Sequence, residues 1–293
     1  MHHRRFWLLP TVLVGLFLAA TSLAEDAVAI PPNWQLNLGL ASRANPAGLM
    51  LNADFGRLWS LPDPTGPART GDVELTYLKL GATVGANPAY AQVGAYVEVF
   101  PFPFFGLRAQ ADMQRYFGAN GALLEFPTAE ADYSPERIGD MGGQERTGSA
   151  WRFLVAPTLR ARFGRILVNN RATMERFDFR DRGPWLYEWE HDTLLAARDW
   201  VITVRSEILY SFGEDLASPG WCTGPAWDLT RADGADRSRI RLAWVTTWRP
   251  RGNLGVFQQP WVFAKVGTPI RDRYREGNLF VIAGVGGNLS LGR

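Results

Sequence analysis

Charged side chains occupy alternate positions in several otherwise apolar stretches of this 293-residue chain. Between positions 150 and 163, Trp151 and Phe153 are odd-numbered, whereas Arg152, Arg160 and Arg162 are all even-numbered. Arginine stays charged and can bind a carboxylate or phosphate through two parallel hydrogen bonds. A row of arginines on one face therefore suits either a network of ion pairs or the recognition of an anion.

The same alternation places twelve charged residues on one common polar face. Arginine outnumbers the acids among them, and rings of charged side chains select solutes by sign, so we expect a preference for anions. The alternative is a ladder of ion pairs that only stiffens a wall. These candidate residues are Arg108, Asp112, Arg152, Arg160, Arg162, Arg171, Glu175, Glu188, Arg205, Glu207, Arg239 and Arg241.

Two turns predict which of these charges meet. A turn at Gly164-Arg165 sets Arg160 opposite Asn169 and Arg152 diagonal to Glu175. A turn over residues 196–199 would set Glu188 beside Arg205. Opposite charges at such positions of neighbouring strands attract each other.

No residue pattern indicates an enzyme, a cofactor or a metal site. His191 is the only histidine after residue 24. It shares its parity with Trp185, Tyr187 and Trp189, so we expect it on the apolar face near a turn; in the membrane barrel inferred below, this is the bilayer boundary near a periplasmic turn. No G-x-S-x-G motif is present, and the acids of residues 125–140 lack the spacing of a calcium loop. Cys222 is expected to be incidental in a loop.

The elements that carry these residues are predicted to be long β-strands. Apolar and polar residues alternate over 11–14 positions in many runs, whereas a tilted strand needs about 9–11 residues to cross a membrane. We predict about 12 strands, with 10 and 14 as alternatives. The runs lie at 105–118, 150–163, 200–212 and 240–248, and others begin near Trp34, Gly48, Val73, Tyr90, Ile166, Trp185, Leu254 and Leu279.

The connections between these strands are unequal in length. Residues 101–104, 164–165, 196–199 and 250–253 form short turns, if residues 185–194 count as a strand. Residues 119–149 and 213–237 form long loops, rich in Gly, Asp, Pro and Glu. Short turns at one end and long loops at the other are typical of transmembrane barrels.

Five aromatic residues lie on the apolar parity near the predicted strand ends. A transmembrane barrel places such residues in girdles at the two membrane interfaces. The alternative is a soluble β-sandwich with these rings in its core. The five residues are Trp151, Trp200, Tyr210, Phe212 and Trp248.

The N-terminus is typical of an exported protein. Residues 1–24 combine Arg4 and Arg5, an apolar stretch of 15 residues and small residues around Ala24, which predicts a cleaved signal peptide. Cleavage removes two of the 31 basic residues and leaves 29 beside 29 acids. A neutral chain of this kind argues against a nucleic-acid partner.

Over residues 33–293 the sequence resembles bacterial outer-membrane β-barrels as an architectural class, through its leader, its alternation and its unequal turns. The resemblance implies an all-β, single-domain, antiparallel up-and-down barrel over residues 25–293. It implies outer-membrane lipid, the barrel-assembly machinery and small solutes as partners. The last residues, Leu289 to Arg293, depart from the terminal aromatic residue usual in this class.

The expected function is a passive narrow channel or small-ligand barrel with an arginine-rich interior. Two alternatives stay open. An outer-membrane lipid hydrolase would depend on His191. A structural or adhesive barrel would bind a partner through its long loops, where Trp221 and Trp227 are expected.

Overall fold

The computed structural model describes residues 33–62, 69–70, 73–74, 76–179, 183, 185–213, 220–250 and 257–290. The predicted signal peptide lies outside these residues. No helix among the described residues is long and apolar enough to cross a membrane.

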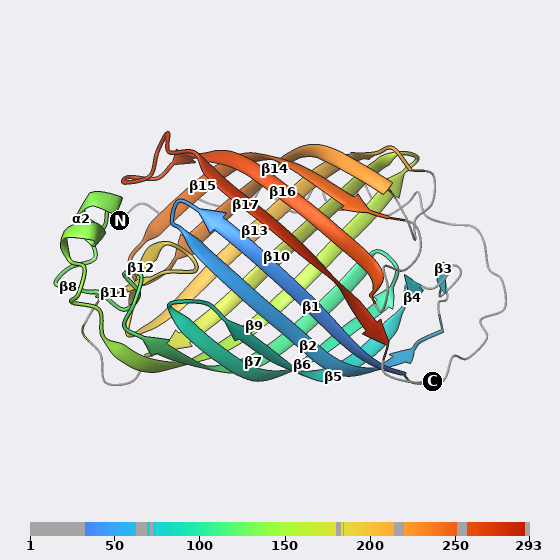
Figure 1. The fold of residues 1–293 in the computed structure, drawn as a ribbon, viewed down its shortest axis with the longest axis horizontal. Helices are drawn as coiled ribbons and strands as arrows, with labels where there is room; N and C mark the ends of the chain where they lie inside the picture. The colour runs from blue at the N-terminus through green and yellow to red at the C-terminus, as the bar shows by residue number, and fades with distance from the viewer. Residues whose placement is uncertain are drawn as a thin grey trace, which may run out of the picture.

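Twelve strands of the described chain form one closed antiparallel barrel (Figure 1). Each pairs with the next barrel strand along the chain, and the first pairs with the last, as predicted for an up-and-down barrel. They are β1 (Asn33–Ala44), β2 (Gly48–Ser60), β5 (Tyr77–Ala86), β6 (Tyr90–Phe102), β7 (Phe105–Phe117), β9 (Thr147–Phe163), β10 (Ile166–Asp178), β13 (Arg198–Ser211), β14 (Gly220–Ala232), β15 (Arg237–Arg249), β16 (Gln258–Arg271) and β17 (Phe280–Ser290).

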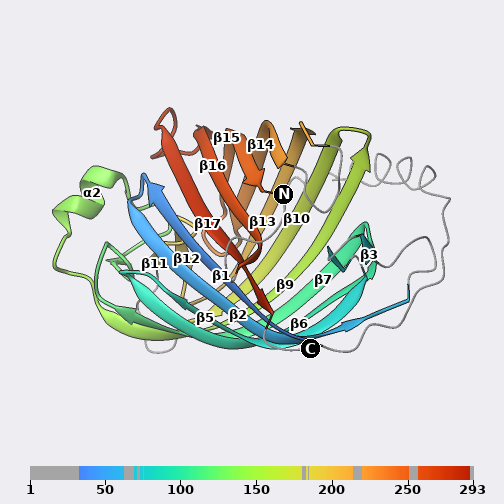
Figure 2. The same cartoon turned by 45° about the vertical axis from the view of Figure 1, so that its right-hand side comes forward.

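The two ends of the barrel carry different elements, as Figure 2 shows. At one end, here called the loop end, are β8 (Glu125–Phe126), α2 (Pro135–Asp140), β11 (Trp185–Glu188) and β12 (Thr193–Ala196). The other end, called the terminus end, carries the start of β1, the end of β17 and the short strands β3 (Arg69–Thr70) and β4 (Val73–Glu74). The predicted long loop over residues 119–149 is confirmed as far as residue 146 and contains β8 and α2, whereas residues 147–149 already belong to β9.

The predicted number of strands is correct, but two of the predicted segments are wrong. Residues 185–194 form no barrel strand, since β11 and β12 pair with each other and β11 pairs with β8. The turn over residues 196–199 therefore lies at the loop end. In compensation, residues 213–237 are no long loop but contain β14. The two errors cancel in the count of twelve.

Local composition explains both errors. β14 has small inward residues such as Cys222 and Ala226 and carries Pro225 on its outward face, so its alternation lacks a row of charges. Trp221 and Trp227 point outward from this strand, which removes them from the loop surface expected for an adhesin. In β11, residues of both parities are buried, because the hairpin lies inside the barrel mouth.

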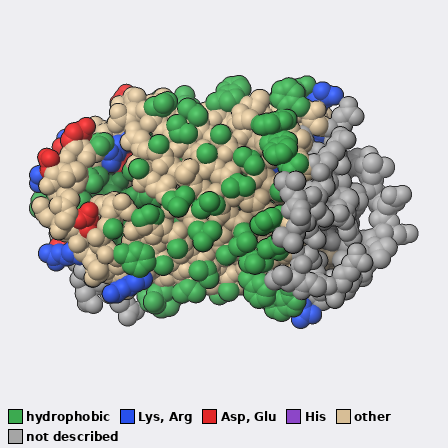
Figure 3. Space-filling model, viewed as in Figure 1, with side chains coloured by type: hydrophobic (Ala, Val, Ile, Leu, Met, Phe, Trp, Pro, Cys, Tyr) green, Lys and Arg blue, Asp and Glu red, His purple; other side chains and the backbone are tan. Residues whose placement is uncertain are grey.

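Apolar side chains cover the outside of the barrel (Figure 3). Leu51, Val93 and Trp244 are each more than half exposed, although such residues are normally buried in a water-soluble protein. Closure leaves no strand edge unpaired, which is the condition for a sheet to exist in hydrocarbon. The exterior is therefore suited to lipid, and the polar parity faces the interior.

An arginine on the outer face should be costly at mid-height and tolerated near an end. Val97 lies near the middle of β6, and Phe117 is the last residue of β7. We expect Val97→Arg to lower the free energy of unfolding by about 2–4 kcal/mol and the matched control Phe117→Arg by about 0–1 kcal/mol. Urea unfolding in phospholipid vesicles measures both, and equal losses would contradict a lipid-facing surface.

Candidate functional site in the barrel interior

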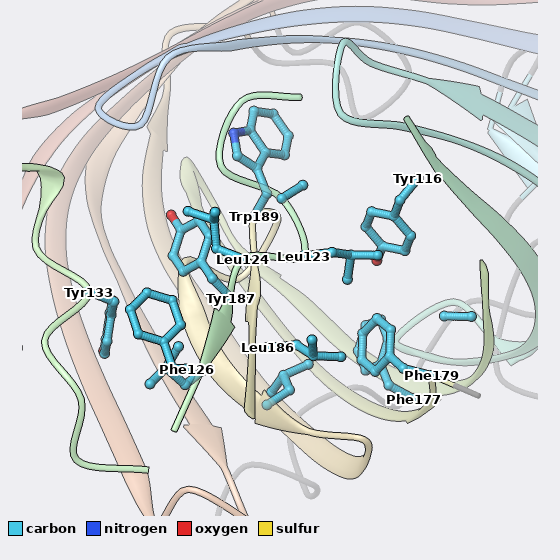
Figure 4. Close-up of a cluster of buried hydrophobic side chains, with 14 of the residues drawn as sticks. Tyr116, Leu123, Leu124, Phe126, Tyr133, Phe177, Phe179, Leu186, Tyr187 and Trp189 are labelled. Carbon is cyan, nitrogen blue, oxygen red and sulfur yellow. The ribbon is translucent and has the colours of Figure 1, made fainter. Parts of the chain in front are cut away.

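The mouth of the barrel at the loop end is filled by a packed apolar cluster (Figure 4). The barrel wall contributes Tyr90, Tyr116 and Phe177, and the loops contribute residues such as Leu123 and Leu186. All five side chains are fully buried. We call residues 185–196, which form β11, β12 and their connection, the plug hairpin, because this cluster holds them in the mouth.

Glu190 joins the plug hairpin to the wall at β6 and β9. Its carboxylate accepts a hydrogen bond from the Tyr90 hydroxyl at 2.6 Å and lies 3.4 Å from the Arg152 guanidinium. Arg152 also binds Asp112 at 2.8 Å and Glu175 at 3.2 Å. One buried cation is thus shared by three carboxylates, two from wall strands and one from the hairpin.

His191 links the plug hairpin to β10. Its Nε2 lies 2.6 Å from Glu175 Oε2, and its Nδ1 lies 2.8 Å from Glu188 Oε2. The edge of the ring meets Phe177. His191 is 7% exposed, so its predicted place at the bilayer boundary is wrong. Residues 185–194 do not belong to the barrel wall, so the alternation in this segment does not mark a lipid-facing side.

Asp192 connects the hairpin to the opposite side of the barrel. Its Oδ2 accepts a hydrogen bond from Arg239 of β15 at 3.0 Å, and its Oδ1 accepts one from Arg275 at 2.8 Å. The Tyr187 hydroxyl donates to the same carboxylate. Arg239 also donates to the backbone carbonyl of His191. This carboxylate and its two arginines form a second anchor.

Arg43 of β1 provides a third anchor. Its guanidinium donates to the carbonyl oxygens of Trp189 at 2.9 Å and Glu190 at 3.0 Å and lies 4.1 Å from the centre of a Trp189 ring. The indole needs the space above Gly48 of β2, where a Cβ atom would lie 2.1 Å from it. The hairpin tip therefore contacts strands on several sides of the barrel and spans its cross-section.

The charge of His191 depends on its two carboxylate neighbours. Burial alone would lower the pKa of His191, but Glu175 and Glu188 outweigh this effect and raise the pKa to about 10. Burial alone would raise the pKa of Glu188, but its bonds with His191 keep that pKa below the ordinary value. The imidazolium therefore bridges hairpin and wall at neutral pH.

The wall formed by β2, β5, β6 and β7 carries paired charges. Arg108 donates to both oxygens of Asp54, at 2.8 and 3.2 Å, and lies 3.7 Å from Glu98. Glu98 accepts a hydrogen bond from the Tyr77 hydroxyl at 2.7 Å. The ring of Tyr96 lies 4.0 Å from the Arg108 guanidinium. This part of the interior is a structural ion-pair network.

The wall from β10 to β15 carries an excess of cations. Strand register aligns Arg171, Arg205, Asp228 and Arg241 in one row across four strands. Asp228 serves both Lys265 at 2.9 Å and Arg241 at 3.2 Å. Within the described residues, the guanidinium groups of Arg171 and Arg205 form no ion pair or hydrogen bond, and both side chains are exposed despite facing inward.

The predicted cross-strand pairs are right in one region and wrong in another. Arg160 pairs with Asn169, and Arg152 lies diagonal to Glu175, as expected from the Gly164-Arg165 turn. The expected neighbourhood of Glu188 and Arg205 is wrong. Glu188 pairs with Thr193 inside the plug hairpin and binds His191.

Three further candidates lie toward the terminus end. Arg160 donates to the carbonyl of Pro103 at 2.6 Å and lies over a phenylalanine ring of β6. Arg162 donates to the carbonyl of Gly164 in the adjoining turn at 2.7 Å. Glu207 of β13 stands opposite Asn169.

The five girdle candidates lie near the two ends of the barrel. Trp151 and Trp200 are near the loop end, whereas Tyr210, Phe212 and Trp248 are near the terminus end. The rings of Tyr210 and Phe212 meet edge to face, with centroids 5.1 Å apart. Trp248 stacks on Trp221, with centroids 5.8 Å apart.

Several charged residues of the interior were not predicted from the sequence. Asp54, Asp228 and Lys265 occupy the inward parity of barrel strands, so a complete parity count could have found them. Glu190, Asp192 and Arg275 lie in connections without periodicity, and no sequence signal brings them to the interior. The missed residues are Arg43, Asp54, Glu190, Asp192, Asp228, Lys265 and Arg275.

The His191 bridge predicts a pH-dependent stability. A pKa raised from 6.5 to about 10 stabilises the fold fully below about pH 6.5, and the contribution is lost as the pH rises through about 10. We expect the thermal midpoint of the wild type to fall between pH 7 and 10.5. The thermal midpoint of His191→Gln should be lower than that of the wild type at pH 7 and should fall less between pH 7 and 10.5. Parallel curves for the two proteins would contradict the bridge.

Comparisons with known proteins find solved structures whose architecture is similar to that of this chain. No family model matches the chain, and no curated protein matches it significantly. Similar solved structures include the β domain of the Bordetella autotransporter BrkA (TM-score 0.44, 11% identity, covering 87% of this chain and 98% of that one) and the KdgM porin (0.41, 9%, 88% and 99%). Another is OmpT of Vibrio cholerae (0.36, 9%, 92% and 99%). The closed barrel and its apolar exterior give this chain the architecture of a bacterial outer-membrane β-barrel.

Proposed function

We propose that the protein is a passive outer-membrane channel for small solutes that favours anions, with the plug hairpin as its narrowest barrier. The observation that carries the proposal is the pair of exposed arginines Arg171 and Arg205 on the inner side of the β10–β13 wall, which form no ion pair with any residue that the structure describes. A charged lining of this kind attracts solutes of opposite sign.

The uneven distribution of charge supports this function. Arg108 and Arg152 are committed to carboxylates of the wall, and a fixed ion pair leaves little charge for a passing solute. On the wall from β10 to β15, the carboxylate of Asp228 is shared by two cations, Lys265 and Arg241. Arg171 and Arg205 add further positive charge to this wall. A solute would therefore follow the wall from β10 to β15.

The surroundings of His191 favour a channel over a lipid hydrolase. Both ring nitrogens are bound to carboxylates, which leaves neither nitrogen to activate a hydroxyl nucleophile. The ring also lies within the plug, away from the outer surface where membrane lipid would be reached. Transport by diffusion needs no catalytic group.

Ion selectivity tests the proposed channel. In planar bilayers under a salt gradient, we expect the refolded wild type to conduct in discrete steps and to have a reversal potential of the anion-selective sign. The double variant Arg171→Glu/Arg205→Glu should shift this potential toward cations, because it reverses the charge at the unpaired positions. The control Arg115→Glu changes an exposed arginine near the loop end and should leave selectivity unchanged. A folded, inserted wild type without conductance would refute the channel.

Loosening the plug should raise conductance. Glu190→Gln/Asp192→Asn removes two of the charges that bind the tip to Arg152 and Arg239, and we expect larger or longer openings. A stronger variant replaces residues 186–195 by two glycines. The control Asp233→Asn changes an acid of the short β14–β15 connection, whose ion pair with Arg231 is exposed. Unchanged conductance in both plug variants would show that the hairpin is not the barrier.

A further inference from the structure

We infer that Arg171 and Arg205 form a binding subsite for a small anion, held through one carboxylate or phosphate group. This inference rests on the proposed function and specifies the solute class that the channel would recognise. The two residues lie directly opposite each other on β10 and β13. Directly paired residues of an antiparallel sheet have Cα atoms about 4.5–5.5 Å apart, so both guanidinium groups can reach the same ligand.

No carboxylate of the described residues lies within the 4.0 Å of an ion pair from either guanidinium group, although Asp228 stands directly opposite Arg205 on β14. Like charges directly opposite each other destabilise a sheet. The nearby acids have other partners: Glu175 binds Arg152 and His191, and Asp228 binds Lys265 and Arg241. An anion between the two arginines would replace the missing carboxylate and relieve their repulsion.

Glu207 is the one acid beside the pair without an ion pair among the described residues. It lies two positions from Arg205 on the same face of β13 and diagonal to Arg171. It is farther from both guanidinium groups than the 4.0 Å of an ion pair, so the local charge stays positive. The negative charge of Glu207 should weaken the binding of an anion. Removing this charge should therefore strengthen binding, opposite to the effect of removing either arginine.

Water already reaches the subsite. Arg171, Arg205 and Asn169 are exposed although they point into the barrel, whereas Glu175, four residues farther along β10 toward the plug, is buried. Four residues of a strand span about 13 Å, which places the arginines well below the hairpin tip. Thr158, opposite Arg171, and Asn169 are neutral neighbours that bring no competing negative charge.

The chemistry of arginine selects the ligand. Its planar fork of donors matches the two oxygens of a carboxylate or phosphate, and charge-assisted bonds of this type are short and strong. Chloride can screen the charge of the two arginines, but as a single atom it does not offer the two oxygens that match the paired N–H donors of a guanidinium group. A small carboxylate or phosphate should therefore bind more tightly than chloride at equal ionic strength.

Calorimetric titration of the refolded protein in detergent with citrate and, separately, with inorganic phosphate tests the subsite. We expect saturable binding of at least one probe, about tenfold weaker in Arg171→Gln and in Arg205→Gln, and tighter in Glu207→Gln. Arg171→Lys keeps the charge but loses the fork, so its affinity should lie between those of wild type and Arg171→Gln. The matched control Arg249→Gln removes an exposed arginine near the terminus end and should bind like the wild type.

Thermal unfolding provides a second readout. The probe should raise the midpoint of the wild type and leave that of Arg171→Gln/Arg205→Gln unchanged, because a ligand stabilises only the state that binds it. If Arg249→Gln weakened the binding of the probe as much as Arg171→Gln does, the anion would be held by a diffuse positive potential and not by the subsite. The absence of saturable binding to the wild type would refute the subsite. Conductance without binding would overturn the subsite alone, whereas binding without conductance would overturn the channel alone.

Discussion

The closure of one antiparallel sheet is the constraint on which the rest of this structure depends. Pairing β1 with β17 satisfies the last two strand edges and separates every strand into an inward and an outward set of side chains. The outward set is apolar and suited to lipid. The inward set must then accommodate all the charge that the strands carry, within a space of limited width. The ion pairs, the plug and the exposed arginines are consequences of this confinement.

A buried charge is stable only with partners, and Arg152 illustrates how the barrel meets this requirement. A buried guanidinium without acceptors would be strongly destabilising, and here it is surrounded by Asp112, Glu175 and Glu190. Glu175 in turn binds His191. The wall therefore fixes the plug hairpin through the same contacts that neutralise its own charges. Folding of the barrel and placement of the plug are physically coupled.

The interior divides into regions with different roles. Near the loop end, the apolar cluster, the ion pairs of Glu190, His191 and Asp192 and the hydrogen bonds of Arg43 hold the plug hairpin in the mouth. Below it, Arg108 on the wall at β2–β7 is paired with Asp54, whereas Arg171 and Arg205 on β10 and β13 are exposed to water. The proposed channel uses this difference: one region sets the barrier, and another sets the preference for anions.

The sequence by itself determined the barrel, because alternation with period two is a local property of each strand. It also determined the register across the Gly164-Arg165 turn, since a two-residue connection fixes the pairs on both sides, including Arg160 with Asn169. Only the tertiary structure decided the course of the plug hairpin and the burial of His191. Long connections carry no period, so nothing local states that Glu190 and Asp192 turn inward to meet Arg152 and Arg239. Those contacts join residues far apart in the chain, and they exist only once the closed sheet has brought its strands around the same space.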